Sequence, residues 1–205
     1  MKNGLIIVGA FHEIIELAED LKIKILGLID NEKKGSYKGY KIIANDLSAE
    51  NLSVELKGCP IIITPDIPKV RAILSKMYQV YGFDFCSLIS NTCKISKSAV
   101  LGKGVIIQHG ANVSAETKIG DFVKLNTNAN VMHDCTIGSF STIAPNAIIL
   151  GNVKIGESCY IGANSTILPN VSICENVIVG AGAVVTKSIV KPGTFAGVPA
   201  RQIGN

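Results

Sequence analysis

The stretch that decides the fold spans residues 119–155 and reads IGDFVKLNTNANVMHDCTIGSFSTIAPNAIILGNVKI. Within it an aliphatic residue returns at every sixth position, and the period continues in both directions without an insertion. All of its seventeen positions are Ile, Leu or Val: Ile89, Ile95, Leu101, Ile107, Val113, Ile119, Leu125, Val131, Ile137, Ile143, Ile149, Ile155, Ile161, Ile167, Ile173, Val179 and Val185. An unbroken period of six predicts a repeat architecture and excludes a β-sandwich, whose strands alternate with a period of two.

A second column supports the repeat, because small or short residues follow four positions after nearly every aliphatic one, as at Ala129, Cys135 and Ala147. A bulky inward residue followed by a small one near a bend resembles the hexapeptide repeat of left-handed parallel β-helices. The resemblance implies that each hexapeptide is a short strand, that three strands make a triangular coil, and that residues 18 apart stack. Residues 89 to about 190 would then make five to six coils.

Glycines spaced by 18 agree with this stacking. They are Gly102, Gly120, Gly138 and Gly156, with a second pair at Gly162 and Gly180. Glycine is expected where a corner needs unusual backbone dihedrals.

Residues 1–85 lack the repeat and predict a small α/β domain, leaving residues 86–205 for the β-helix. The pattern indicates strands at residues 4–9, 23–29 and 61–64, and helices at residues 12–21 and 67–78. Alternating strands and helices imply a parallel, Rossmann-like sheet.

Ligands of such sheets lie beyond the carboxyl ends of the strands. An acidic residue about 20 positions after the first glycine turn is typical of nucleotide recognition, although the full glycine-rich fingerprint is absent. His12 either contacts a nucleotide or begins the helix. The expected substrate-binding residues at this edge are Gly9, Phe11, His12, Asp30, Asn31 and Thr64.

Net charge, apolar segments and cysteine spacing indicate which ligands and which cellular location to expect. The net charge is +4, yet no run of Lys or Arg gathers it, which suits a small anionic ligand at least as well as nucleic acid. The apolar opening is short and is soon followed by acidic residues, so neither a signal peptide nor a membrane span is expected. Six cysteines without C-x-x-C spacing indicate neither a zinc cluster nor a disulfide framework. A cytoplasmic location is expected.

Two motifs extend the resemblance to a family. Asn126 precedes His133-Asp134-Cys135 by seven residues, and the chain nears its end with the run AGVPAR at residues 196–201. With a Rossmann-like domain ahead of a β-helix, these motifs resemble the sugar O- and N-acyltransferases. The resemblance implies acetyl transfer from acetyl-CoA to a sugar, with a nucleotide-linked 4-amino-sugar as the expected acceptor. It also implies a homotrimer that holds acetyl-CoA between neighbouring β-helices.

The same resemblance assigns roles to individual residues. His133 would be the general base, Asp134 would orient it, and Asn126 would contact the acceptor. Thr142 replaces a histidine often found nine residues after the base, and Phe11 replaces a glycine of the family's nucleotide loop. The residues assigned to acetyl-CoA are Thr142, Gly151, Ala163, Ala181, Lys187 and Arg201, and no metal is expected.

The chemistry of acetyl transfer fits these residue types. A base must take the proton of the acceptor, and histidine has the ordinary pKa nearest neutrality. Adjacent strand residues point to opposite faces, so Asp134 reaches His133 only if the chain bends there; otherwise Glu116 or Asp121 could serve. Gly151 stacks on His133 in the next coil, where it either leaves room for a thioester and donates to its oxyanion or is a conformational glycine at a bend.

The sequence also offers alternative interpretations of the catalytic histidine and of the activity. His109 occupies the same hexapeptide position as His133 but another side of the prism, and without an adjacent acid we interpret it as a surface residue. A carbonic-anhydrase-type trimer would need two neighbouring histidines and a third across an interface. A free sugar or serine acceptor and a non-catalytic scaffold are further alternatives.

Overall fold

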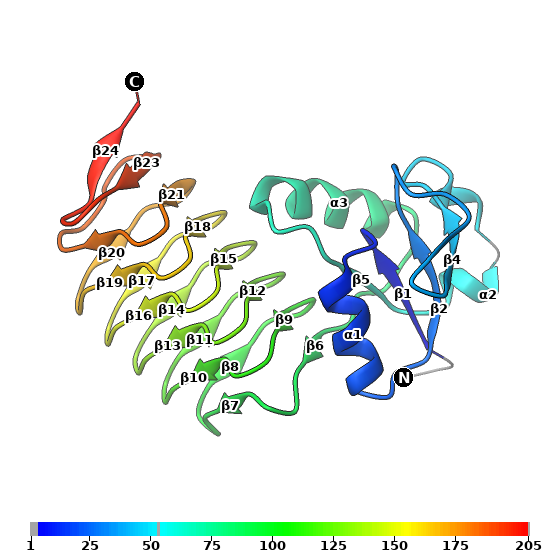
Figure 1. Ribbon diagram of the computed structural model, residues 1–205, viewed down its shortest axis with the longest axis horizontal. Coiled ribbons are helices and arrows are strands. Elements are labelled where there is room, and N and C mark those ends of the chain that lie inside the picture. The colour runs from blue at the N-terminus through cyan, green and yellow to red at the C-terminus, as the bar shows by residue number, and fades with distance from the viewer. Residues whose placement is uncertain (1–3, 53, 205) are drawn as a thin grey trace.

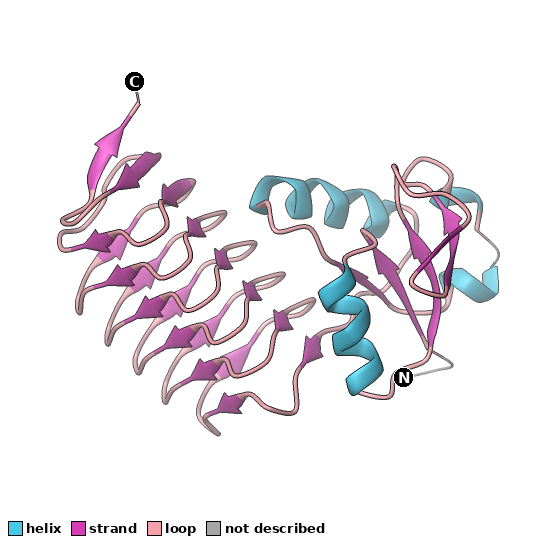
Figure 2. Ribbon diagram, viewed as in Figure 1, coloured by secondary structure: helices cyan, strands magenta, loops and turns pink. Residues whose placement is uncertain are grey.

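The structure, a computed structural model, describes residues 4–52 and 54–204 and has two parts (Figures 1 and 2). All helices described lie in the N-terminal part, and short strands joined by loops form the C-terminal part. The N-terminal sheet and the last hairpin lie at opposite ends of the molecule.

The N-terminal part is an α/β sheet in the strand order β3-β4-β2-β1-β5. The pairs β4–β2, β2–β1 and β1–β5 are parallel, and β3–β4 is an antiparallel hairpin. Its elements are β1 (Leu5–Val8), α1 (His12–Asp20), β2 (Ile25–Ile29), β3 (Ser36–Tyr37), β4 (Tyr40–Ala44), η1 (Ala49–Asn51), α2 (Val54–Lys57), β5 (Ile61–Ile63) and α3 (Pro68–Val80). The three predicted strands and two predicted helices are present. The hairpin and the two short helices were not predicted.

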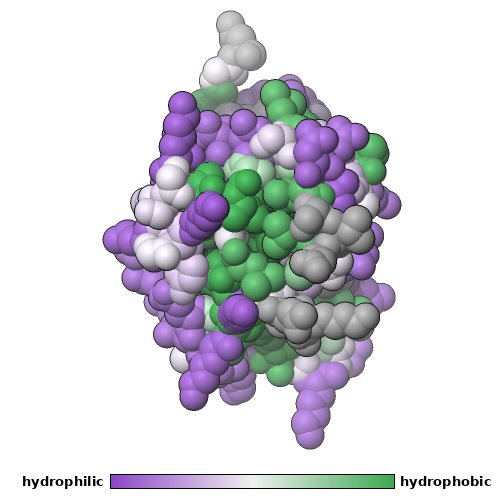
Figure 3. Space-filling view, turned by 90° about the vertical axis from the view of Figure 1, so that its right-hand side faces the viewer, coloured by the Kyte–Doolittle hydropathy of each residue, from purple (hydrophilic) through white to green (hydrophobic). Residues whose placement is uncertain are grey.

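The outer end of this part is not uniformly polar. Seen from the side opposite the last hairpin, apolar residues gather in the middle of the face and hydrophilic side chains surround them (Figure 3).

The C-terminal part is a three-sided parallel β-helix, whose strands from β6 to β22 pair with those 18 residues away, as Val113 does with Val131. β23 pairs with β21 at a separation of 16 residues, and β24 is antiparallel to β23. The first face carries β6 (Leu88–Ile89), β9 (Ile106–Ile107), β12 (Lys124–Leu125), β15 (Thr142–Ile143), β18 (Tyr160–Ile161), β21 (Val177–Val179), β23 (Gly193–Ala196) and β24 (Arg201–Ile203). The second face carries β7 (Lys94–Ile95), β10 (Asn112–Val113), β13 (Asn130–Val131), β16 (Ile148–Ile149), β19 (Thr166–Ile167) and β22 (Val184–Val185). The third face carries β8 (Val100–Leu101), β11 (Lys118–Ile119), β14 (Thr136–Ile137), β17 (Lys154–Ile155) and β20 (Ser172–Ile173).

The core of the β-helix is the aliphatic column seen in the sequence. From Ile107 to Val185 every residue of that column is buried, and the small residues that follow pack beside it. Each coil therefore covers the apolar surface of the coils before and after it, which is how repeat folds bury a continuous core.

The corners use a different column from the one expected. Residues with positive φ recur every six positions: Gly104, Gly110, Glu116, Phe122, Asn128, Asp134, Phe140, Asn146, Asn152, Ser158, Asn164, Asn170, Asn176 and Gly182. Asparagine is the commonest residue there, because it tolerates the left-handed region better than most residues.

The glycines spaced by 18 are not in this column, so the dihedral reason given for them is wrong. They are instead places of close approach between coils. A Cβ on Gly138 would lie 2.5 Å from the backbone nitrogen of Glu157, and one on Gly156 would lie 2.5 Å from that of Glu175. Steric contact with the next coil therefore explains their spacing.

The N-terminal part packs on the first face. Phe122 belongs to the same apolar cluster as Ile6 and Ile61, and its ring stacks on Phe140 at 5.3 Å. The chain passes from one part to the other within a few residues, since the N–H of Cys86 donates to Ile61 of β5 and that of Leu88 donates to Val105 of the β-helix. The two parts thus share buried surface.

Candidate active site

A histidine–carboxylate pair stands at the second corner, which joins the second and third faces. His133 and Asp134 lie between β13 and β14, and Asp134 has φ 59°. This bend brings its Oδ2 to 2.8 Å from Nδ1 of His133, and the two side chains are 61% and 57% exposed. The chain therefore bends at Asp134, as it must for this carboxylate to reach His133. Asp121 is engaged elsewhere, since its carboxylate accepts from the N–H of Lys103.

Gly151 lies beside the imidazole, as the 18-residue rule predicts. A Cβ on it would meet Cε1 of His133 at 2.7 Å and Nε2 at 2.8 Å. Its φ lies outside the left-handed region, and the residue that takes positive φ at this corner is Asn152. The conformational explanation for Gly151 is therefore wrong. A side chain at this position would meet the ring of His133 where it now lies, so the ring would have to shift.

The hydrogen bonds between coils do not need an N–H at the position of Gly151. Pro169, which has no N–H, takes the equivalent position one coil further on. Among the residues that the structure describes, the N–H of Gly151 donates no backbone hydrogen bond. It is available to a ligand beside His133.

Asn126 lies at a different corner, the first, which joins the first and second faces. It is 5% exposed, and its Nδ2 lies 3.4 Å from the carboxylate of Asp66. Its Oδ1 is buried without a hydrogen-bond partner among the described residues. The second face separates Asn126 from His133, so a single chain does not join the two.

A buried lysine beside Asn126 was missed by the sequence analysis. Lys124 is 1% exposed, and its Nζ lies 2.8 Å from Asp66 and 3.0 Å from the carbonyl oxygen of Thr64. The ammonium also lies 4.8 Å from the centre of the Phe11 ring. Burial lowers the pKa of Lys124, and Asp66 partly opposes that shift. No sequence pattern marks this lysine, since other outward lysines of the repeat are exposed.

Thr142 is not available to acetyl-CoA, which corrects its assignment. It is fully buried under the N-terminal part, where its Oγ1 donates to the carbonyl oxygen of Asp66 (2.7 Å) and accepts from Arg71 (2.8 Å). Arg71 is itself 1% exposed and donates also to the carbonyl oxygens of Phe122 and Phe140. Thr142 thus belongs to a polar link between the two parts.

Two of the predicted substrate residues are structural. The hydroxyl of Thr64 is fully buried and lies 2.9 Å and 2.8 Å from the carbonyl oxygens of Val8 and Gly9. Thr64 therefore presents no side chain to a ligand. Gly9 has φ 82°, and a Cβ there would lie 2.6 Å from Oγ1 of Thr64, so glycine is required by the backbone and by its neighbour.

Asp30 links the loops that follow β1 and β2. Its carboxylate accepts from the N–H groups of Ala10 (2.8 Å), Glu32 (3.0 Å) and Lys33 (2.8 Å). Burial alone would raise the pKa of Asp30, but these N–H donors outweigh it and hold the pKa below its usual range. A ribose contact would have to compete with these bonds. Asn31 is likewise engaged, because its amide pairs with Asp46.

Phe11 and His12 border an open hollow at the start of α1. The hollow has a volume of about 330 Å³, and Lys33 and Tyr37 line its other side. Phe11 is 39% exposed, and Nε2 of His12 lies 3.0 Å from Glu16 in the next turn. His12 is the first residue of α1, as one of its two explanations predicted, and it also borders the hollow.

His109 has an acidic neighbour that the sequence does not reveal. Its Nε2 lies 3.5 Å from Asp20 at the end of α1, and its Nδ1 lies 2.9 Å from Oγ of Ser90. His109 therefore has no acidic neighbour in the sequence, but it has one, Asp20, in the fold. His109 joins the β-helix to α1 at the first corner, away from His133.

Four of the residues assigned to acetyl-CoA divide between two corners: Gly151 and Lys187 lie at the second, and Ala163 and Ala181 at the first. Lys187 stacks above Gly151 and Pro169, about 14 Å from the level of His133 at the usual strand spacing of about 4.8 Å. Ala163 and Ala181 lie at the first corner with Asn126, and Arg201 is exposed in β24. Within residues 4–52 and 54–204, no three His, Cys, Asp or Glu side chains are grouped as for a metal, and no helix is long and apolar enough to cross a membrane.

Comparisons with known proteins agree with this architecture. The family described as bacterial transferase hexapeptide (six repeats) matches residues 116–151 and 152–187. The acetyltransferase domain of PglB from Neisseria gonorrhoeae, solved with acetyl coenzyme A, is 30% identical with a TM-score of 0.92, over 99% of this chain and 100% of that one. A search of curated proteins gave no match.

Two further solved structures are similar over nearly the whole chain. PerB from Caulobacter crescentus, in complex with CoA and GDP-perosamine, is 26% identical with a TM-score of 0.92, over 100% of this chain and 99% of that one. WeeI from Acinetobacter baumannii is 27% identical with a TM-score of 0.89, over 97% and 99% of the two chains.

A β-helix of hexapeptide coils with an exposed His–Asp pair at one corner defines an enzyme of the transferase class. The chain belongs to the hexapeptide-repeat transferase family.

Proposed function

We propose that the protein transfers the acetyl group of acetyl-CoA to the amino group of a nucleotide-linked sugar, with a 4-amino-sugar as the expected acceptor. The observation that carries the proposal is the His133–Asp134 pair with Gly151 against its ring. Similar proteins support the substrates, since PerB was solved with CoA and GDP-perosamine and the PglB domain with acetyl coenzyme A.

The geometry suits base catalysis by His133. When Nδ1–H of His133 donates to Asp134, Nε2 is left unprotonated and faces the exposed corner. As the acceptor nitrogen attacks the thioester carbonyl, Nε2 takes its proton and the C–N bond forms. The C–S bond then breaks, and the same proton can pass to the departing CoA thiolate.

Gly151 supports the second requirement, stabilisation of the oxyanion. Its missing side chain leaves space beside the imidazole, and its N–H is not used by the coil. We assign that N–H as the donor to the thioester oxygen as negative charge develops. Lys187, on the same corner, would meet the phosphates of CoA.

The division of residues between two corners supports a cyclic homotrimer. His133, Gly151 and Lys187 lie at the second corner, whereas Asn126 and the pair Ala163 and Ala181 lie at the first. Three-fold symmetry can bring the second corner of one subunit against the first corner of the next. Acetyl-CoA would lie between them, in β-helices that we take to be left-handed as in the family.

The N-terminal part, residues 1–85, is proposed as a Rossmann-like domain that binds the acceptor. β1 ends just before the loop from Gly9 to Glu13, and α1 begins within that loop. The unpaired N–H groups at the start of a helix favour a diphosphate. Phe11 and His12 border the hollow that leads to this point.

The test is an assay of thiol release with acetyl-CoA and a panel of nucleotide-linked amino-sugars. We expect one of these acceptors to stimulate release, and His133→Ala to lower kcat by about two to four orders of magnitude. His109→Ala is the matched control and should retain kcat, because Nδ1 and Nε2 of His109 are engaged by Ser90 and Asp20. A silent His133→Ala with an inactive His109→Ala would reverse the assignment.

A further inference from the structure

Asp66, in the loop between β5 and α3, holds a carboxylate beside Asn126 at the first corner. Its backbone carbonyl oxygen accepts from Oγ1 of Thr142 at 2.7 Å and from Nη1 of Arg71 at 2.9 Å. Its Oδ1 lies 2.8 Å from Nζ of Lys124, a buried side chain. The backbone and the carboxylate of Asp66 are therefore both fixed by groups of α3 and the first face.

The other oxygen of this carboxylate is available to a ligand. Nδ2 of Asn126 also lies on Oδ1, at 3.4 Å, whereas Oδ2 has no hydrogen-bond or ion-pair partner among the described residues. The side chain of Asp66 is 32% exposed, so the carboxylate is accessible from solvent. Oδ1 of Asn126 is a second acceptor, buried and without a donor in the same part of the chain. Two unpaired acceptors thus lie on neighbouring side chains.

Phe11 connects this carboxylate with the loop proposed to hold the diphosphate. Nζ of Lys124, which pairs with Asp66, lies 4.8 Å from the centre of the Phe11 ring. Phe11 is 39% exposed and borders the hollow at the start of α1. A sugar attached to a diphosphate at that loop would therefore lie beside Phe11, with Asp66 and Asn126 next to it.

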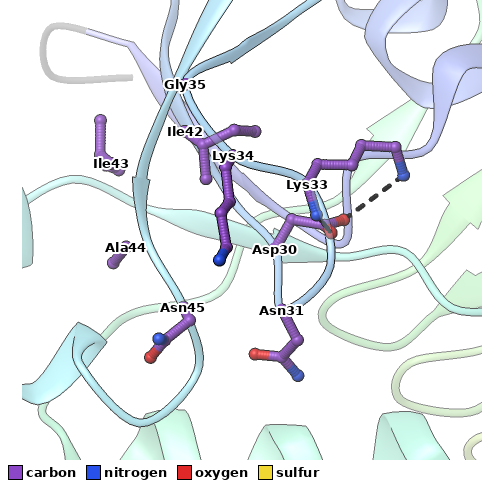
Figure 4. A pocket seen from close by; sticks show the side chains of 9 residues that line it. All are labelled: Asp30, Asn31, Lys33, Lys34, Gly35, Ile42, Ile43, Ala44 and Asn45. Carbon is purple, nitrogen blue, oxygen red and sulfur yellow. Dashed lines mark hydrogen bonds and ion pairs between the residues drawn. The ribbon is translucent and has the colours of Figure 1, made fainter.

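Asp30, which follows β2 in the same sheet, is engaged by contrast. It accepts from the N–H groups of Ala10, Glu32 and Lys33, and it lies 3.6 Å from Nζ of Lys33 (Figure 4). Its side chain is 11% exposed, against 32% for Asp66. Of these two carboxylates, Asp66 is therefore the one that offers a free oxygen to a ligand.

We propose that Asp66 is an acceptor-binding residue: Oδ2 of Asp66 and Oδ1 of Asn126 accept hydrogen bonds from O–H or N–H groups of the acceptor sugar, and Lys124 positions Asp66 for this contact. The inference rests on the proposed function. An ionised carboxylate and an amide oxygen accept but do not donate, so they match the hydroxyl and amino groups of a sugar. Such a ligand also supplies the donor that the buried oxygen of Asn126 lacks.

A variant without either charge separates sugar binding from folding. Asp66→Leu alone would leave the buried ammonium of Lys124 unpaired, so it is combined with Lys124→Met, since apolar side chains often replace a buried ion pair without loss of stability. We expect the midpoint of urea unfolding to stay near the wild-type value. The KM for the nucleotide-linked amino-sugar should rise about tenfold or more, the effect of one lost hydrogen bond to a charged group. The kcat and the Kd of acetyl-CoA should change little, because the lost contact holds only the bound sugar.

Asp66→Asn tests the same contact with Lys124 in place. Its KM for the sugar should rise about threefold, because a neutral oxygen accepts a hydrogen bond about half as strongly as a carboxylate. This variant decides the matter if the double variant does not fold. The matched control is Lys118→Met, since Lys118 opens β11 as Lys124 opens β12 but is exposed, and its KM should equal that of the wild type.

The possible failures point to different errors. If Asp66→Asn and the folded double variant kept the wild-type KM for the sugar, Asp66 would be a structural residue only, while the proposed acetyl transfer stood. A parallel rise in the Kd of acetyl-CoA would also overturn the inference, because the change would then not be specific to the sugar. If the wild type released thiol with none of the nucleotide-linked amino-sugars, the proposed function itself would be wrong.

Discussion

At the scale of single residues, the site depends on the backbone conformation at one corner of the β-helix. Asp134 occupies a left-handed corner position, and the resulting bend turns its carboxylate back to His133. Gly151 is determined by the same corner in the next coil, because the imidazole fills the space that a side chain would need. Two neighbouring coils therefore build the proton-transfer group together.

Adding one methyl group at Gly151 should impair the chemistry. In Gly151→Ala the new Cβ would start 2.7 Å from the ring of His133, so the ring must move. We expect kcat to fall by about a hundredfold, the cost of misplacing a catalytic group by about 1 Å. The measurement is steady-state kinetics with circular dichroism to check the fold. Pro169→Ala, one coil further on, should keep wild-type kcat, and an equally active Gly151→Ala would remove the steric explanation.

The lowered pKa of Asp30 predicts a pH-dependent contribution to stability. Because the carboxylate is favoured in the folded state, Asp30 stabilises the fold above its unfolded pKa of about 3.9, and this is lost as pH falls through the folded pKa. Asp30→Asn should therefore lower the free energy of unfolding at pH 7 and matter less at pH 3. Urea unfolding at both pH values measures this. Asp84→Asn, at an exposed position, is the control variant, and an equal effect of Asp30→Asn at both pH values would contradict the linkage.

At the scale of elements, the hydrogen bonds that join α3 to the β-helix come from the side chain of Arg71. Arg71 donates to carbonyl oxygens of Pro65 and Asp66 on its own side and of Phe122, Phe140 and Ser141 on the β-helix. Burial lowers the pKa of Arg71 to about 10, which still leaves it protonated at neutral pH. The helix and the coils are thus held in one relative position.

Replacing this arginine should loosen the contact between the parts. Arg71→Met leaves several buried carbonyl groups without donors, and we expect the free energy of unfolding to fall by about 3 kcal/mol. Urea unfolding at a fixed protein concentration measures this. Lys69→Met on the exposed side of α3 should change stability by no more than about 0.5 kcal/mol. If both variants were equally stable, the hydrogen bonds of Arg71 would not be the main link.

At the scale of the whole molecule, the candidate site is incomplete in one chain. The first face is covered by the chain's own N-terminal part, and the cofactor residues stand at the two edges of the second face. We therefore expect light scattering at micromolar concentration to give three times the chain mass of 21.7 kDa. A monomer mass would exclude the shared site.

Subunit mixing gives a sharper test of the same arrangement. His133→Ala and Asn126→Ala should each be inactive alone. Co-assembled at equal amounts, they should recover about a quarter of wild-type activity, because one interface in four pairs two intact halves. No recovery in a confirmed mixed trimer would place both residues in the site of a single subunit.

The sequence by itself determined the β-helix, since a period of six places one inward aliphatic residue on every short strand of the repeat. The 18-residue stacking also placed Gly151 beside His133, whereas the pairing of His133 with Asp134 was expected from the family resemblance. Only the tertiary structure decided what crosses between the two parts. Thr142 and Thr64 are buried, Asp20 lies beside His109, and Lys124 pairs with Asp66. These contacts join segments that are far apart in the chain, and no sequence period relates those segments.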